Sequence, residues 1–214
     1  MTALSKIIYY LANPLLMPLY TLLLLFQIQS ATINIVPPNL KIFLYAFTFV
    51  LCAFFPLVSI FGLKYTRSVA SIHLTSKEER VIPYILAILY YGITYYMLRY
   101  KFGVDYLIPA PVFSSLLGAI FALSLVSLIN IKTKISAHCV GISGVLGAFI
   151  AAGNKYYTAN TLEISMLTFV LMLAVGLTAT SRLWLKAHNE SQVYSGLFLG
   201  FAIEYLFVNF DIII

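Results

Sequence analysis

Residues 108–130 read IPAPVFSSLLGAIFALSLVSLIN, an apolar stretch that contains no charged side chain. About 20 such residues form a helix long enough to cross the roughly 30 Å hydrocarbon core of a bilayer, so this stretch predicts a transmembrane helix. The same criterion predicts further spans at 7–29, 40–63, 82–99, 138–153, 162–180 and 193–210. The last range carries Glu204 and could lie partly at the interface, so the pattern allows six or seven spans. We expect residues 1–214 to form a single all-α domain, a polytopic transmembrane helical bundle.

The composition excludes an ordinary soluble domain. The 214 residues are 62% hydrophobic and 9% charged, whereas about 25% of residues are charged in a typical soluble protein. The net charge of +6 suits lipid phosphates at helix ends, and the only short basic run is Lys132-Thr-Lys134, so we expect no nucleic-acid partner. Cys52 and Cys139 lie in apolar surroundings, where free buried thiols are favoured over a disulfide.

Two of the expected spans have unusual sequences. Span 138–153 is short and rich in glycine, alanine and serine, and small residues let helix backbones approach closely, so we expect it at the centre of the bundle. Span 7–29 contains Asn13 and Pro14 and lacks the small-residue cleavage pattern of a signal peptide, so we expect a retained first helix. Glu204 would be costly in lipid, and it is either functional, protonated or paired with a basic side chain.

The connections between the spans divide into a polar and a plain group. The polar connections, 64–81, 131–137 and 181–192, follow the second, fourth and sixth expected spans, so counting places them on one membrane face. They contain or border all three histidines. Together with Lys6, this face collects nine of the thirteen basic residues: Lys6, Lys64, Arg67, Lys77, Arg80, Lys132, Lys134, Arg182 and Lys186.

Such a face suits a phosphate ligand. A guanidinium group binds phosphate oxygens bidentately, and two histidines beside it suit phosphoryl transfer, one as nucleophile and one as proton donor. The alternative is that Arg182 and Lys186 are helix-end anchors that contact lipid headgroups. Because Ser181 and His188 flank them, we favour the phosphate site.

The segment Ser181-Arg182, five residues, His188, three residues, Gln192 resembles the third signature of the type 2 phosphatidic acid phosphatase superfamily, S-R-x5-H-x3-D. Ser136-Ala-His138 resembles the second signature, P-S-G-H. Arg80 and Pro83 loosely match the first signature, K-x6-R-P, with either Lys77 or His73 in the position of its lysine. His73 has the exact spacing, seven positions before Arg80.

This resemblance implies a metal-independent phosphatase that needs no cofactor and acts on a membrane lipid phosphate or diphosphate. By this resemblance His188 would form a phosphohistidine, His138 would protonate the leaving oxygen and Gln192 would orient His188. Phosphate would be bound by Arg80, Arg182, Ser136 and either Lys77 or His73. Gln192 replaces the aspartate of the family, so a catalytically weak relative that binds or moves anionic lipids is the alternative.

Two considerations give opposite orientations of the polar face. The polar face carries nine basic residues and the other face four, and under the positive-inside rule this difference favours a polar face in the cytoplasm. When the proposed ligands Lys77, Arg80 and Arg182 are left out of the count, the difference falls to six against four. The resembling lipid phosphatases generally act on the extracytoplasmic side, which is the side we expect, in a bacterial inner membrane. The sequence leaves the lipid and the oligomeric state open.

Overall fold

The computed structural model describes residues 3–71, 76–156 and 161–214, which are largely helical and contain no β-strand. Six helical segments among them are long and apolar enough to cross a membrane. They are α4 (Pro38–Phe49) with η2 (Val50–Phe54) and α5 (Phe55–Tyr65), then η3 (Glu78–Arg80) with α6 (Val81–Tyr96) and η4 (Met97–Lys101), then α7 (Ala110–Lys132), α8 (Ala137–Tyr156), α9 (Thr161–Trp184) and α10 (Glu190–Asn209). Short η5 (Asp105–Leu107) precedes α7. The expected all-α transmembrane bundle is confirmed, and the protein is an integral membrane protein.

The first expected span is not one continuous helix. It is divided into α1 (Ala3–Leu11), the single turn η1 (Pro14–Leu16) and α2 (Met17–Leu25), because Pro14 has no N–H to continue the helical ladder. The side chain of Asn13 stabilises the break by accepting a hydrogen bond from the Leu15 N–H at 3.0 Å. The prediction of an unbroken helix over 7–29 is therefore wrong, whereas the helix that carries Glu204 is a full-length span.

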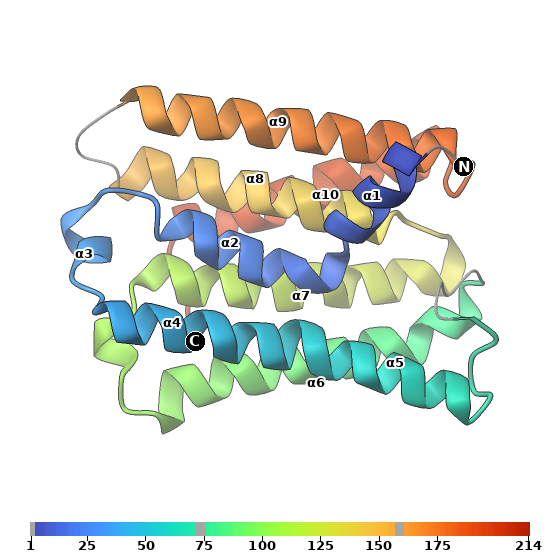
Figure 1. Cartoon of the computed structure of the whole chain (residues 1–214), viewed down its shortest axis with the longest axis horizontal. Coiled ribbons are helices and arrows are strands. Elements are labelled where there is room, and N and C mark those ends of the chain that lie inside the picture. Colours follow the sequence, from blue (N-terminus) through green and yellow to red (C-terminus); the bar gives the residue numbers. More distant parts are fainter. Residues whose placement is uncertain (1–2, 72–75, 157–160) are drawn as a thin grey trace.

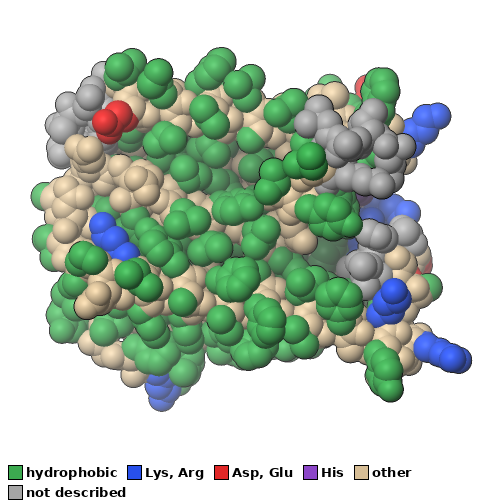
Figure 2. Space-filling model, in the orientation of Figure 1, with side chains coloured by type: hydrophobic (Ala, Val, Ile, Leu, Met, Phe, Trp, Pro, Cys, Tyr) green, Lys and Arg blue, Asp and Glu red, His purple; other side chains and the backbone are tan. Residues whose placement is uncertain are grey.

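The two ends of the bundle differ as the counting of spans predicted. Figure 1 shows the connections from α7 to α8 and from α9 to α10 at the same end as the N-terminus, together with the end of α5. The short α3 (Ala31–Asn34) lies at the opposite end. Figure 2 shows apolar side chains along the length of the bundle and Lys and Arg side chains toward its ends, which is the distribution expected of a protein surrounded by lipid.

Helix α8 lies at the centre of the bundle, as its small residues predicted. Its apolar window is 72% buried, against 44% for α7, the next most buried span. Its main neighbour is α10, and glycines allow the two backbones to touch. A Cβ atom on Gly147 would lie 2.5 Å from the Phe201 carbonyl oxygen, and one on Gly200 would collide with the Val140 carbonyl.

Replacement of Gly200 by alanine is expected to destabilise the protein, because the added methyl group must push two helix backbones apart. Overpacking of a close contact costs about 1–3 kcal/mol, so we expect a clear fall in the thermal unfolding midpoint of purified protein in detergent. Gly176→Ala is the matched control, since no atom of the described residues lies within 4 Å of its added Cβ and alanine favours a helix. Equal midpoints for the two variants would contradict this account of the interface.

Candidate functional site

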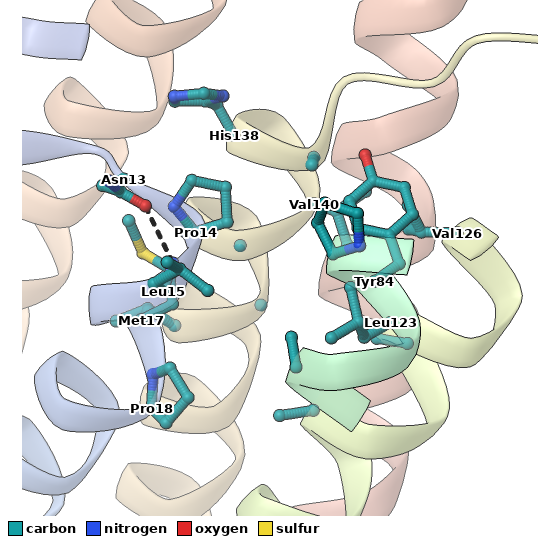
Figure 3. Close-up of a pocket in the computed structure, with 18 of the residues that line it drawn as sticks. Asn13, Pro14, Leu15, Met17, Pro18, Tyr84, Leu123, Val126, His138 and Val140 are labelled. Carbon is teal, nitrogen blue, oxygen red and sulfur yellow. Dashed lines mark hydrogen bonds between the residues drawn. The ribbon is translucent and has the colours of Figure 1, made fainter. Parts of the chain in front are cut away.

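A cavity of about 910 Å³ extends into the bundle from the end that carries the polar connections. His138, His188, Arg80 and Arg182 all line it, although they come from four separate segments of the chain. Figure 3 shows His138 on α8 and Tyr84 on α6 on opposite sides of this cavity, with the Asn13–Leu15 turn along one wall. The structure therefore brings together the two imidazoles and two guanidinium groups that the sequence had placed only on a common face.

His188 is held by the beginning of α10. Asn189 caps this helix by accepting a hydrogen bond from the Gln192 N–H at 2.9 Å, and the Gln192 side chain returns to the Asn189 N–H at 3.4 Å. The same Gln192 Oε1 lies 3.0 Å from His188 Nδ1. An amide oxygen can only accept, so His188 Nδ1 carries the proton and donates it. This tautomer leaves the lone pair of Nε2 free to act as a nucleophile.

The surroundings of His188 favour its neutral form. Partial burial lowers the pKa of His188 below its ordinary value, and the positive charges of Arg80, Arg182 and Lys134 lower it further, while the hydrogen bond to Gln192 opposes the shift. Burial and like charges both disfavour the imidazolium. We infer that His188 is neutral near pH 7, which is the state a nucleophile requires.

Arg182 is buried near the end of α9. Only 3% of its surface is exposed, and no carboxylate of the described residues forms an ion pair with it. Its guanidinium lies 4.9 Å from the centre of the Tyr9 ring, Nη2 donates to Ser181 Oγ at 3.2 Å, and Nε has no hydrogen-bond partner there. A buried charge is costly unless it is paired, so the site is suited to receive an anion.

His138 lies at the start of α8 beside the same tyrosine. Its ring centre is 5.0 Å from that of Tyr9, at an angle of 32°, and its side chain hydrogen-bonds to the Tyr9 backbone. Tyr9 thus contacts both His138 and Arg182. The sequence reasoning missed Tyr9 because it lies in an apolar stretch far from every motif, and only the folding of α1 against α9 brings it here.

The remaining predicted ligands are placed differently. The Lys77 ammonium group reaches the Ile131 carbonyl at 3.4 Å and is not among the residues that line the cavity, because the turn before η3 packs on the end of α7. Ser136 is fully buried and does not line the cavity either; its N–H donates to the Gln192 carbonyl at 3.1 Å and ties α8 to α10. The structure therefore does not bring these two residues to the cavity, and their assignment as phosphate ligands stays a prediction. His73 lies outside the described residues.

Lys134 takes the place expected for Lys77. It lines the cavity and acts electrostatically on His188. The sequence had shown Lys134 only as one of nine basic residues on this face, and its neighbour Lys132 offered an equal signal. Whether Lys132 or Lys134 faces the cavity depends on the residue at which α7 ends, and the sequence does not determine that residue exactly.

Comparisons with protein-family models, with curated proteins and with solved structures gave no match to this chain. Membership of the phosphatase superfamily therefore stays a prediction from three short motifs. The site itself combines two imidazoles, two guanidinium groups and two lysines, Lys134 and Lys186, in the lining of a cavity that extends into the membrane-spanning part of the bundle.

Proposed function

We propose that this protein is a membrane-embedded phosphatase that hydrolyses a lipid phosphate or diphosphate through a phosphohistidine on His188, without a metal ion. The observation that supports this function is the meeting of His138, His188, Arg80 and Arg182 in one cavity at one end of the bundle. Each group has a role in phosphoryl transfer, and they come together from segments that are distant in sequence. The motif order and spacing resemble those of type 2 phosphatidic acid phosphatases.

The proposed reaction has two steps. In the first, His188 Nε2 attacks phosphorus and the bond from phosphorus to the lipid oxygen breaks, while His138 donates a proton to the leaving alkoxide. In the second, a water molecule gives its proton to His138 and attacks the phosphohistidine, which releases inorganic phosphate and neutral His188. Arg80, Arg182 and Lys134 offset the negative charge of the phosphoryl oxygens throughout.

A lipid is the substrate class that suits the remainder of the cavity. Beyond the basic mouth, the walls are mainly apolar side chains from α5, α6, α7 and α8, including Leu57, Ala87, Leu123, Val126 and Val145. A phosphorylated headgroup would bind at the mouth while its hydrocarbon tail stays in an apolar environment. A small water-soluble phosphate ester would leave these walls unused.

The direct test is phosphate release by purified protein in detergent, with EDTA present. The panel contains phosphatidic acid, phosphatidylglycerol phosphate, an isoprenyl diphosphate and a lipid A phosphate, with glycerol phosphate as the soluble control. We expect release from at least one lipid, little from glycerol phosphate and no inhibition by EDTA. The proposal fails if no lipid is hydrolysed or if EDTA stops the reaction.

We place this site on the extracytoplasmic side of a bacterial inner membrane, where the resembling phosphatases generally act. Lys186 is exposed at the same end of the bundle, and both native cysteines are buried. We therefore expect a Lys186→Cys variant to react with a membrane-impermeant maleimide in intact cells. Reaction only after the cells are permeabilised would reverse this orientation.

The second candidate is a relative that binds anionic lipid without hydrolysing it. The neutral Gln192 at His188 Nδ1 favours it, because an amide cannot stabilise an imidazolium as a carboxylate does. This function predicts binding of phosphatidic acid without release of phosphate, and loss of that binding in Arg182→Glu. Phosphate release by the wild-type protein excludes it.

Replacement of Gln192 by glutamate is expected to raise phosphate release and to change its pH dependence. Glutamate keeps the length of the side chain and adds a negative charge beside His188, which favours the imidazolium and raises the pKa of His188. In serine proteases, loss of the orienting aspartate lowers kcat by about 10⁴ because the histidine adopts the wrong tautomer. Here Gln192 already selects the correct tautomer, so we expect a gain of about tenfold.

The pH profile of kcat/KM reports the protonation of the free enzyme. Because the pKa of His188 is lowered in the native protein, its neutral form and its activity should persist below the ordinary titration range of histidine. In Gln192→Glu the acid limb should move to higher pH, and Gln192→Asn, which is shorter and uncharged, is the control. If the acid limb of the kcat/KM profile is unchanged in the glutamate variant, the titration of His188 does not control catalysis.

A further inference from the structure

The deep end of the cavity contains a carboxyl group that the proposed phosphatase reaction does not use. Glu204 projects from α10 and lines the cavity, with only 7% of its surface exposed. Its Oε2 has no hydrogen-bond partner among the described residues. Gly118 on α7 and Gly144 on α8 make room for it, since a Cβ on either glycine would lie 3.0 Å from an atom of the Glu204 side chain.

Further polar side chains line the cavity with Glu204. Tyr91 of α6 lines the cavity, and its hydroxyl donates a long 3.5 Å hydrogen bond to the Pro14 carbonyl. Ser115 of α7 and Thr21 of α2 are buried and line the same cavity. Four helices therefore each contribute a polar residue to the lining of a cavity whose walls are otherwise mainly apolar.

Glu204 and Tyr91 lie far below the mouth of the cavity, where the phosphate would bind. Glu204 is twelve positions after Gln192 in α10, which corresponds to about 18 Å along a helix. Tyr91 is eleven positions after Arg80, or about 17 Å. Both values place these two side chains roughly halfway across a hydrocarbon core of about 30 Å.

A hydrocarbon tail alone does not account for a carboxyl group at this depth. A polar group buried among apolar side chains without a partner is costly, and polar residues inside membrane spans usually serve a function. A neutral carboxyl group both donates and accepts. It would match a hydroxyl group on a ligand.

We propose that the floor of the cavity is a second ligand-binding site, at which Glu204 hydrogen-bonds a hydroxyl group carried partway along the hydrocarbon tail of the lipid phosphate. This inference rests on the proposed function for the position of the phosphate at the mouth. Glu204 is then a specificity-determining residue that selects among lipid tails, and it takes no part in the transfer of the phosphoryl group.

The test compares two lysophosphatidates that differ in one group. Ricinoleoyl lysophosphatidate carries a hydroxyl partway along its chain, and oleoyl lysophosphatidate lacks only that hydroxyl. Binding is measured in detergent by calorimetry, on a His188→Ala background so that neither lipid is consumed. One hydrogen bond to a buried partner should favour the hydroxylated lipid about tenfold in Kd.

Two substitutions of Glu204 assign this preference to the carboxyl group. Glu204→Gln keeps a donor and an acceptor and should retain most of the preference, whereas Glu204→Leu should abolish it while oleoyl lysophosphatidate still binds. The leucine variant also controls for the different partitioning of the two lipids into detergent micelles. Equal Kd values for the two lipids in protein with native Glu204 overturn the inference, even if the leucine variant fails to fold.

Failure of this inference and failure of the proposed function give different results. With native His188, phosphate release from both lipids at the same kcat/KM, together with equal Kd values, supports the phosphatase and overturns the tail-binding site. Tighter binding of the ricinoleoyl lipid, with no phosphate release from it or from any lipid of the panel above, supports the tail-binding site and overturns the phosphatase. If neither lipid binds, the proposed site at the floor of the cavity is overturned as well.

Discussion

The His188→Ala variant is expected to lose phosphate release from lipid phosphates by about 10⁴-fold or more, since removal of a nucleophile eliminates the covalent route. The neutral Nδ1–H tautomer set by Gln192 leaves Nε2 as the attacking atom, and no second imidazole among the described residues is held in this way. The measurement is steady-state phosphate release by purified protein. The acid-labile phosphohistidine should be trapped from radiolabelled substrate in the native protein and be absent from the variant.

Lys132→Ala is the matched control for this experiment. Lys132 is exposed at the same end of the bundle and is not among the residues that line the cavity, so its loss should leave kcat within about twofold, as expected for a surface change. Binding of phosphatidic acid to His188→Ala should remain near the native level, because Arg80 and Arg182 are intact. Full turnover by purified His188→Ala would falsify the phosphohistidine mechanism.

The transmembrane spans could be predicted from the sequence because their signal is local. A window of about 20 apolar residues is sufficient to recognise a span, and the small residues of 138–153 correctly predicted the central position of α8. The break at Asn13-Pro14 also had a local signal, since proline interrupts a helix. The prediction of a continuous span over 7–29 relied on the length of the apolar stretch and did not allow for the break at that proline.

The candidate site was only partly predictable because its geometry depends on packing between distant segments. Counting spans placed His138, His188 and Arg182 on one face, yet it could not tell which side chains turn inward. Tyr9 enters the site because α1 packs beside α9, and Lys134 rather than Lys77 lines the cavity. No pattern of residues near either position carries this information.

The position of Glu204 in the fold could not be predicted from the sequence either. A carboxylate in a membrane span is costly, so the sequence marked Glu204 as unusual, but it left open whether this residue was functional, protonated or paired. The structure places it against Gly118 and Gly144 at the floor of the cavity. That position depends on three helices at once, and periodicity within α10 alone does not give it.

The His138→Ala variant is expected to lose about 10²–10⁴ in kcat on lipid phosphates, which is the usual contribution of a general acid. The loss should depend on the leaving group. An alkoxide leaves poorly without a proton, whereas the phenolate of an aryl phosphate such as p-nitrophenyl phosphate needs little protonation. The aryl ester should therefore form the phosphohistidine at a near-native rate in His138→Ala, while His188→Ala should be inactive on both substrates.

The second step gives this prediction a separate readout. If His138 also accepts the proton of the attacking water, its loss slows hydrolysis of the phosphohistidine, and the intermediate accumulates. Stopped-flow measurement of His138→Ala with p-nitrophenyl phosphate should then show a burst of nitrophenolate close to one equivalent per protein, followed by slow turnover. A histidine that only packs against Tyr9 would slow the lipid and aryl substrates equally and give no burst, and that result would remove His138 from the reaction.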